Sequence, residues 1–254
     1  YGVDVIYAFK LDNGELIDVA IATEGDDKRL SVFRIYTSSP YLREITSGTI
    51  NTEGDANDVA GYVSPFTGRA YAFVARDDGE IVQIELYDDG DGQIEGDASG
   101  ERVIDVGNSV SGIVVDREMG YLYVAVYSQE RIYRYDAEPD ERDGDDYHVI
   151  AREDELEDNT LRGLTLYYNG FKDGYLFVSL EDDSTFAVYE RNGDNDYVGS
   201  FTIGKDSDDI DRTDATRGID VVNVNLGPDF ECGAFVAQDS NNDRYSLNRE
   251  RTNF

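Results

Sequence analysis

Several residue types are scarce in this chain of 254 residues. It has no tryptophan, one cysteine, one histidine, one methionine and four prolines. A single cysteine cannot form an internal disulfide. The lone histidine, His148, gives little support to a Ser-His-Asp hydrolase or a histidine-rich zinc site. No apolar run approaches the roughly 20 residues that cross a bilayer, and we expect no membrane partner.

The two rare side chains each have a structural interpretation. Cys232 lies in an apolar segment that leads into a strand, with no candidate base beside it. We expect it to be a buried small hydrophobe and not a reactive thiol. His148 falls in an expected strand flanked by acidic residues.

Basic residues are also few. There are 22 lysines and arginines against 55 acidic residues, a net charge of −33, and only four of the basic residues are lysines. Phosphate groups would be repelled, so we expect no nucleic-acid partner. This composition has two interpretations that stay open: a high-salt habitat, where screening shortens the reach of self-repulsion, or a generally acidic extracellular protein.

The chain does contain a repeat. An apolar strand that opens with glycine returns at Gly61, Gly112, Gly163 and Gly218, at separations of 51, 51 and 55 residues. Such a period is typical of a propeller or a solenoid. Alternating aromatic and β-branched residues follow each glycine and favour strands over helices. Four strands per unit is the pattern of one propeller blade.

The strands of each unit can be placed in order. Second strands are expected at 71–75, 121–125, 175–179 and 234–237, third strands at 80–86, 131–137 and 184–190, and fourth strands at 102–106, 146–151 and 197–203. An opening unit has strands at 3–9, 16–22 and 30–36. We therefore predict an all-β fold, a β-propeller of four-stranded antiparallel blades. Because each unit buries its faces only against its neighbours, we expect one domain, 1–254, with units at about 1–58, 59–108, 109–158, 159–210 and 211–254.

The residue before each repeat glycine defines a ring position. These residues are Ala60, Ser111, Arg162 and Arg217. If the units surround an axis, the four side chains meet at one mouth, which is where we expect a functional site.

Residues 88–94 look like the middle of an EF-hand loop, with acids at the third and fifth positions and glycine at the sixth. Tyr87 and Ala98 stand at the first and twelfth positions and supply no carboxylate. We interpret this segment as a hairpin loop with incidental weak calcium affinity.

Several separated strings, in order and in register over nearly the whole chain, resemble the β-propeller phytases. They are YDAEPD at 135–140, GLTLYY at 163–168, FAVYERNGDNDYVGSFTI at 186–203, GIDV followed by LGPDF within 218–230, and AFVAQD at 234–239. The resemblance implies a six-bladed propeller, secreted and calcium-dependent, that hydrolyses phytate phosphomonoesters as a 3-phytase. It also implies phytate or another phosphorylated small molecule as the ligand, and we expect a monomer or one domain of a longer polypeptide.

The family has an N-terminal Asp-Asp-Pro-Ala motif, and nothing in this chain matches it. Five units could close as a five-bladed ring or leave sheet edges exposed. We expect the family's six-bladed arrangement with a gap.

The chain departs from the family at the calcium-binding ring. The family's Thr-Glu-Gly, Asp-Ile-Glu-Gly, Asp-Thr-Asp-Gly and Ala-Glu-Glu-Asp motifs correspond here to 110–112, 160–163, 215–218 and 125–128. Ser111, Arg162 and Arg217 therefore replace acids. The resemblance retains two calcium-binding positions, Asp211 and Asp239, so we expect calcium to be reduced or absent at the catalytic position.

The family's phosphate-binding bases are displaced as well. A family Arg corresponds to 23–25 and a family Lys to Asp77, with Arg76 adjacent. Arg162, Arg217, Arg76 and Ser111 are candidates for binding an anion directly, since guanidinium groups suit phosphate and carboxylate. Alternatively, Arg162 and Arg217 pair with local acids such as Asp211 or Asp214 and act as structural replacements for calcium.

Three functions remain open at this point. The first is a phytase-family domain whose catalysis is lost or much weakened. The second is an active calcium-dependent phytase or phosphatase that uses substitute ligands. The third is a non-catalytic anion-binding or scaffold propeller, and a fold alone does not decide among them.

Overall fold

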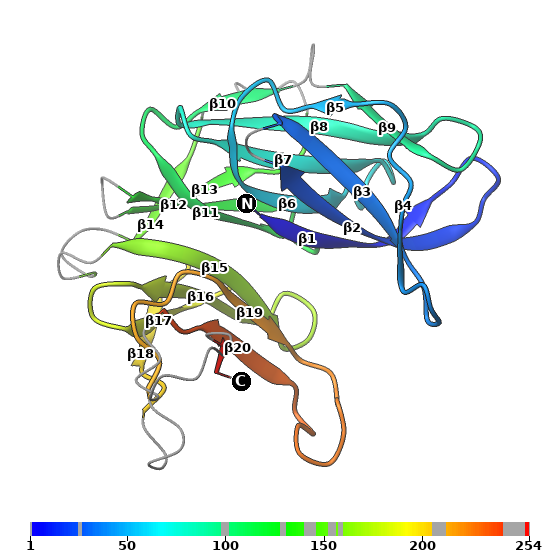
Figure 1. Ribbon diagram of the computed structural model, residues 1–254. Helices are drawn as coiled ribbons and strands as arrows, with labels where there is room; N and C mark the ends of the chain where they lie inside the picture. The colour runs from blue at the N-terminus through cyan, green and yellow to red at the C-terminus, as the bar shows by residue number, and fades with distance from the viewer. Residues whose placement is uncertain are drawn as a thin grey trace. The chain divides into compact units, whose positions relative to one another are not determined.

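The structure is a computed structural model that describes residues 2–24, 27–97, 102–127, 131–139, 146–151, 156, 160–204, 212–240 and 252–253. The secondary structure in these ranges is almost entirely β-strand, and the strands form five sheets in chain order (Figure 1). None of the described helical residues forms a helix long and apolar enough to cross a membrane.

The first two sheets have five strands each. The first contains β1 (Val3–Lys10), β2 (Leu16–Glu24), β3 (Arg29–Ile35), β4 (Leu42–Glu44) and β5 (Ile50–Asn51). The second contains β6 (Ala56–Val63), β7 (Ala70–Arg76), β8 (Glu80–Asp88), β9 (Ile94–Asp97) and β10 (Val103–Asp105).

The remaining sheets have four, four and three strands. They are β11 (Val110–Asp116), β12 (Tyr121–Val126), β13 (Arg131–Asp136) and β14 (His148–Ala151); then β15 (Leu161–Tyr168), β16 (Gly174–Leu180), β17 (Thr185–Glu190) and β18 (Tyr197–Phe201); and then β19 (Ile219–Val222), β20 (Ala234–Gln238) and β21 (Thr252–Asn253).

This architecture confirms the predicted fold class. The first four sheets each contain four or more strands, and the first three strands of each sheet pair in chain order, as in propeller blades. In the first sheet β4 and β5 both pair with β3, and in the second β9 and β10 both pair with β8. The strand positions expected from the repeat agree with the observed ones to within a few residues, and His148 lies in a strand as expected, as the first residue of β14. The single domain and the unit boundaries stay predictions.

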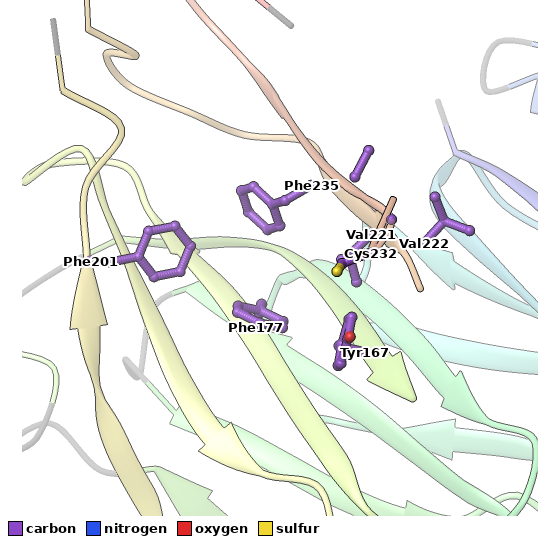
Figure 2. Close-up of a pocket in the computed structure, with 9 residues that line it drawn as sticks. Tyr167, Phe177, Phe201, Val221, Val222, Cys232 and Phe235 are labelled. Carbon is purple, nitrogen blue, oxygen red and sulfur yellow. The ribbon is translucent and has the colours of Figure 1, made fainter. Parts of the chain in front are cut away.

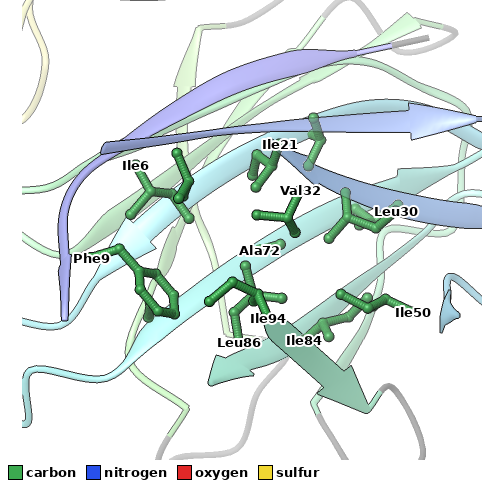
Figure 3. Close-up of a cluster of buried hydrophobic side chains, with 14 of the residues drawn as sticks. Ile6, Phe9, Ile21, Leu30, Val32, Ile50, Ala72, Ile84, Leu86 and Ile94 are labelled. Atoms are coloured by element: carbon green, nitrogen blue, oxygen red, sulfur yellow. The ribbon is translucent and has the colours of Figure 1, made fainter. Parts of the chain in front are cut away.

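The chain divides into two compact units, one formed by Tyr1–Tyr123 with Arg134–His148 and the other by Val124–Tyr133 with Val149–Phe254. In the first unit, the sheets that begin with β1 and β6 bury a hydrophobic core between them, which is aliphatic except for Phe9 (Figure 3). Successive side chains of β2 point to opposite faces of the sheet. Ile17, Val19 and Ile21 are therefore buried in this core, while Leu16 and Asp18 are exposed.

Two carboxylates tie the inner strands of the first unit together. Asp4 on β1 accepts the backbone N–H of Gly61 at 2.7 Å, and Asp58 on β6 accepts that of Ile113 at 2.9 Å. Each carboxylate also accepts the N–H of the residue that follows it in the chain. These bonds satisfy backbone donors that face the neighbouring sheet and would otherwise be buried without a partner.

In the second unit, β15 lies beside the start of β19. The side chains between these sheets are aromatic. Phe177 and Phe186 each contact both Phe201 and Phe235, which also contact each other, at centroid distances of 5.1 to 6.0 Å. Offset and edge-to-face contacts of this kind stabilise a core beyond the area that they bury.

Candidate functional site

The ring positions of the fourth and fifth repeats are held close by their backbones. Gly163 donates its N–H to the carbonyl oxygen of Arg217 at 2.7 Å, and the hydroxyl of Ser179 donates to the same oxygen at 3.0 Å. A Cβ atom on Gly163 would lie 2.5 Å from that oxygen. The repeat glycine is therefore required for close approach, and it places residues 162 and 217 next to each other.

Their side chains converge on one carboxylate. The Nε atom of Arg162 donates to Oε2 of Glu181 at 2.5 Å, and Nε of Arg217 donates to Oε1 of Glu181 at 2.9 Å. Arg162 also lies over the ring of Tyr127, with Cζ 4.8 Å from the ring centroid. We call Arg162, Glu181 and Arg217 the Arg-Glu-Arg cluster.

The three members of this cluster differ in exposure. The Glu181 side chain is 15% exposed and that of Arg162 is 23% exposed, whereas that of Arg217 is 62% exposed. Arg217 donates only its Nε atom to a described residue, so its two terminal nitrogens face no described protein acceptor. Beside the cluster, hydrogen bonds from the Thr160 side chain and N–H, together with the charge of Arg162, hold the pKa of Asp182 below its ordinary value.

This arrangement does not fit a calcium ion at the ring positions of the fourth and fifth repeats. Ca²⁺ takes six to eight oxygen ligands, and both carboxylate oxygens of Glu181 are already engaged by guanidinium groups. A divalent ion about 4 Å from one guanidinium would be repelled by about 8 kcal/mol at an effective dielectric of 20. Within the ranges that the structure describes, no three His, Cys, Asp or Glu side chains gather into a potential metal cluster.

The arginine partners predicted from the sequence were wrong in part. Asp214 pairs with Arg212, at 2.8 Å, and not with Arg162 or Arg217. Asp211 lies outside the described residues. Asp239, the other predicted calcium ligand, follows β20, is fully buried, and accepts the N–H of Asp214 at 3.0 Å. Its role as a metal ligand stays a prediction.

Arg76 and Ser111 belong to the first compact unit. The Arg76 guanidinium binds Asp78 at 2.6 Å and Glu80 at 2.5 Å, and its hydrogen bond lowers the pKa of Asp78. Its side chain is therefore already engaged by two acids. Ser111 is half-buried in β11. The anion-binding role predicted for these two residues is untested.

The sequence did not single out Glu181, nor the contact with Arg162 that Tyr127 makes from within segment 125–128. Both residues directly follow the second strand of their repeat, and in the second repeat Arg76 is the last residue of that strand. The alignment of second strands was therefore the signal that could have identified this second ring of positions.

Two further expectations concern isolated features. The prediction that Cys232 is buried was wrong: the thiol is exposed, because Cys232 lies in the turn before β20 and not in the strand. The EF-hand-like segment is a hairpin loop between β8 and β9, as expected, and Asp88 and Asp89 use their carboxylates to accept N–H groups within it. Its weak calcium affinity is untested.

The repeated antiparallel sheets are those of a β-propeller. The sequence profile of the family described as Phytase matches residues 1–250. The 3-phytase of Bacillus subtilis (strain 168) is 37% identical over 247 residues, which cover 94% of this chain and 63% of that protein. The chain belongs to the phytase family, and it spans less than two thirds of the length of this relative.

Solved structures with low sequence identity share the fold. A putative 6-phosphogluconolactonase from Bacteroides uniformis is 17% identical with a TM-score of 0.54, covering 92% of this chain and 63% of that one. The BBS1N chain from a complex with ARL6DN is 12% identical with a TM-score of 0.55, covering 93% of this chain and 61% of that one. At these identities the similarity concerns the fold alone.

Proposed function

We propose that this chain is a phytase-family propeller domain in which the calcium-dependent hydrolysis of phytate phosphomonoesters is lost or much weakened. The observation that carries the proposal is the Arg-Glu-Arg cluster. Arg162 and Arg217 occupy ring positions where the family resemblance places carboxylates, and they neutralise Glu181, the acid that remains between them. Ser111 replaces a third acid of the same pattern.

The cluster can hold neighbouring segments of the chain together in place of a metal ion. Three hydrogen-bonding groups from β15, from the end of β16 and from the segment before β19 meet at one point. An ion pair with Glu181 only 15% exposed and with two cationic partners is stronger than an isolated surface pair. In the family, the corresponding segments would be joined by a calcium ion bound to their carboxylates.

A second candidate function is supported by one observation. The exposed Arg217 has terminal nitrogens that no described residue engages, and a guanidinium edge of this kind can bind a phosphate or carboxylate. A non-catalytic anion-binding propeller is therefore the alternative, with phytate or another phosphorylated small molecule as its ligand. Secretion and a monomeric state belong to the proposal as well.

The test is phosphate release from phytate by the purified chain, with and without calcium, beside the Bacillus subtilis 3-phytase as a positive control. We expect no calcium-dependent release. Saturable phytate binding without release, reduced in Arg217→Gln and unchanged in Arg212→Gln, would support the anion-binding alternative. Calcium-dependent turnover would overturn the proposal and would mean that substitute acids rebuild the site.

A further inference from the structure

The second compact unit contains an apolar cavity of about 230 Å³ that the proposed function does not use (Figure 2). Its walls come from the β15–β18 sheet and from β19 and β20. Four aromatic side chains line it: Tyr167, Phe177, Phe201 and Phe235. All four are only half-buried, so part of each ring remains in contact with solvent.

Close backbone contacts at two glycines hold the strands that form the walls of the cavity in place. Gly233 precedes β20 with φ +104°, and a Cβ there would lie 1.9 Å from the carbonyl oxygen of Val222. Gly174 begins β16 with φ +138°, and a Cβ there would lie 1.9 Å from the carbonyl oxygen of Tyr167. Phe177 and Phe201 each contact Phe235, at centroid distances of 5.6 and 5.5 Å. Collapse of the cavity would require these contacts to rearrange.

The chemistry of the lining selects the class of ligand. No lining residue is charged, and Tyr167 and Cys232 supply the only polar side-chain atoms. A cavity of about 150 Å³ lined by apolar side chains suffices for benzene, so this one has room for one or two fused rings. The net charge of −33 disfavours an anion of the same size.

We propose that this cavity is a binding site for a small neutral aromatic molecule of one or two rings. Binding would remove the exposed parts of the four aromatic side chains from water, which is the main source of affinity in apolar pockets. Edge-to-face contacts with Phe177, Phe201 and Phe235 would orient the ligand. This site is independent of the Arg-Glu-Arg cluster, and the inference does not rest on the proposed loss of catalysis.

The chain is convenient for a direct test. It has no tryptophan and a single cysteine, Cys232, which is exposed and lies among the lining residues. Indole added to the 254-residue chain can therefore be followed by its own fluorescence, while the rate at which Cys232 reacts with a bulky maleimide reports on occupancy. We expect saturable indole binding with Kd of about 0.1–1 mM and a Cys232 reaction that slows as indole saturates.

Two variants distinguish indole binding in the cavity from nonspecific adsorption of indole elsewhere. Ala234→Leu fills the space from β20 and is expected to weaken indole binding at least about 10-fold, with circular dichroism confirming that the variant is folded. Phe66→Ala removes an aromatic side chain that is 81% exposed in the other compact unit, and it should leave binding unchanged. Indole-3-acetate, an anion of similar shape, should bind more weakly than indole.

Several outcomes would overturn the inference. The first is indole binding that does not saturate, and the second is equal affinity of wild type and folded Ala234→Leu for indole. The third is a loss of indole affinity in Phe66→Ala as large as that in Ala234→Leu. The fourth is a Cys232 reaction rate that indole does not change. The last measurement needs no variant, so the inference remains testable even if Ala234→Leu does not fold. Phytate hydrolysis by the same preparation would contradict the proposed function and leave this inference untouched.

Discussion

At the scale of single residues, the half-buried Asp58 shows how a carboxylate joins neighbouring sheets. Its two oxygens accept the N–H groups of Val59 and Ile113, each at 2.9 Å. Burial raises the pKa of Asp58 from an ordinary value of 3.8 to about 6, although both hydrogen bonds lower it. The energetic cost of removing the charge from water therefore exceeds the gain from two backbone donors.

This raised pKa predicts a direction for stability against pH. The unfolded chain releases the Asp58 proton near its ordinary pKa of 3.8, while the folded chain keeps it up to about 6. Between these values the folded state binds more protons, so the contribution of Asp58 to the free energy of unfolding falls as pH rises, by about 3 kcal/mol in total.

The measurement is urea unfolding of wild type and Asp58→Asn between about pH 4 and about pH 7. Because asparagine does not titrate, the difference in unfolding free energy between the two proteins should change with pH in this window, with wild type losing stability relative to the variant as pH rises. Parallel pH profiles would show that Asp58 has an ordinary pKa in the folded protein.

The Arg-Glu-Arg cluster is also a feature of single residues. Arg162 and Arg217 could be identified from the sequence because each precedes a repeat glycine. Their shared partner could not, since Glu181 is 19 residues from Arg162 and 36 from Arg217 along the chain. Only the closure of β15 against the start of β19 shows that one carboxylate serves both.

At the scale of strands, the close contact between β15 and the segment before β19 predicts unequal roles for two repeat glycines. A Cβ on Gly163 would lie 2.5 Å from a backbone oxygen, whereas a Cβ on Gly218 would meet nothing within 4 Å. Gly163→Ala should destabilise the protein by about 1–3 kcal/mol, because the backbone must move. Gly218→Ala should change stability by less than about 0.5 kcal/mol.

Thermal unfolding of the two variants tests this difference. Because Gly163 and Gly218 occupy the same position of the repeat, each variant is the matched control for the other. Similar losses in both would mean that the glycines serve the repeat in the same way and that the approach of β15 to Arg217 is not the constraint. A smaller loss in Gly163→Ala than in Gly218→Ala would contradict the described geometry.

Strand positions could be predicted where the sequence alternates and not elsewhere. The second strand expected at 175–179 is observed as β16, Gly174–Leu180, because aromatic and aliphatic residues alternate with the pleat. The short strand β4 was missed, since Leu42, Arg43 and Glu44 are all exposed and carry no alternation. The exposure of Cys232 could not be predicted, because its apolar surroundings do not reveal the turn that Gly233 makes at φ +104°.

At the scale of the whole molecule, the charge predicts a response to salt. Acidic residues outnumber basic ones by 55 to 22, so repulsion between like charges outweighs the attraction of the exposed ion pairs. Raising KCl from about 0.1 to about 1 M shortens the Debye length from about 10 to about 3 Å. We expect the melting temperature to rise over this range, as repulsion in the compact state is screened.

Differential scanning calorimetry at several KCl concentrations provides the measurement. Replacing KCl by an equal ionic strength of sodium chloride is the control for a specific potassium effect. A melting temperature that falls with salt would show that attractive surface ion pairs contribute more than the net charge, and it would argue against adaptation to high salt.

We propose that Arg162 and Arg217 stand in place of a calcium site in this phytase-family propeller, and titration calorimetry with calcium is the decisive measurement. Wild type is compared with the double variant Arg162→Glu, Arg217→Asp in about 1 M KCl, which suppresses nonspecific binding to the acidic surface. We expect the variant to gain a saturable calcium site that wild type lacks, because Glu181 is then joined by two further carboxylates. Tight calcium binding by wild type that the double variant leaves unchanged would contradict the claim.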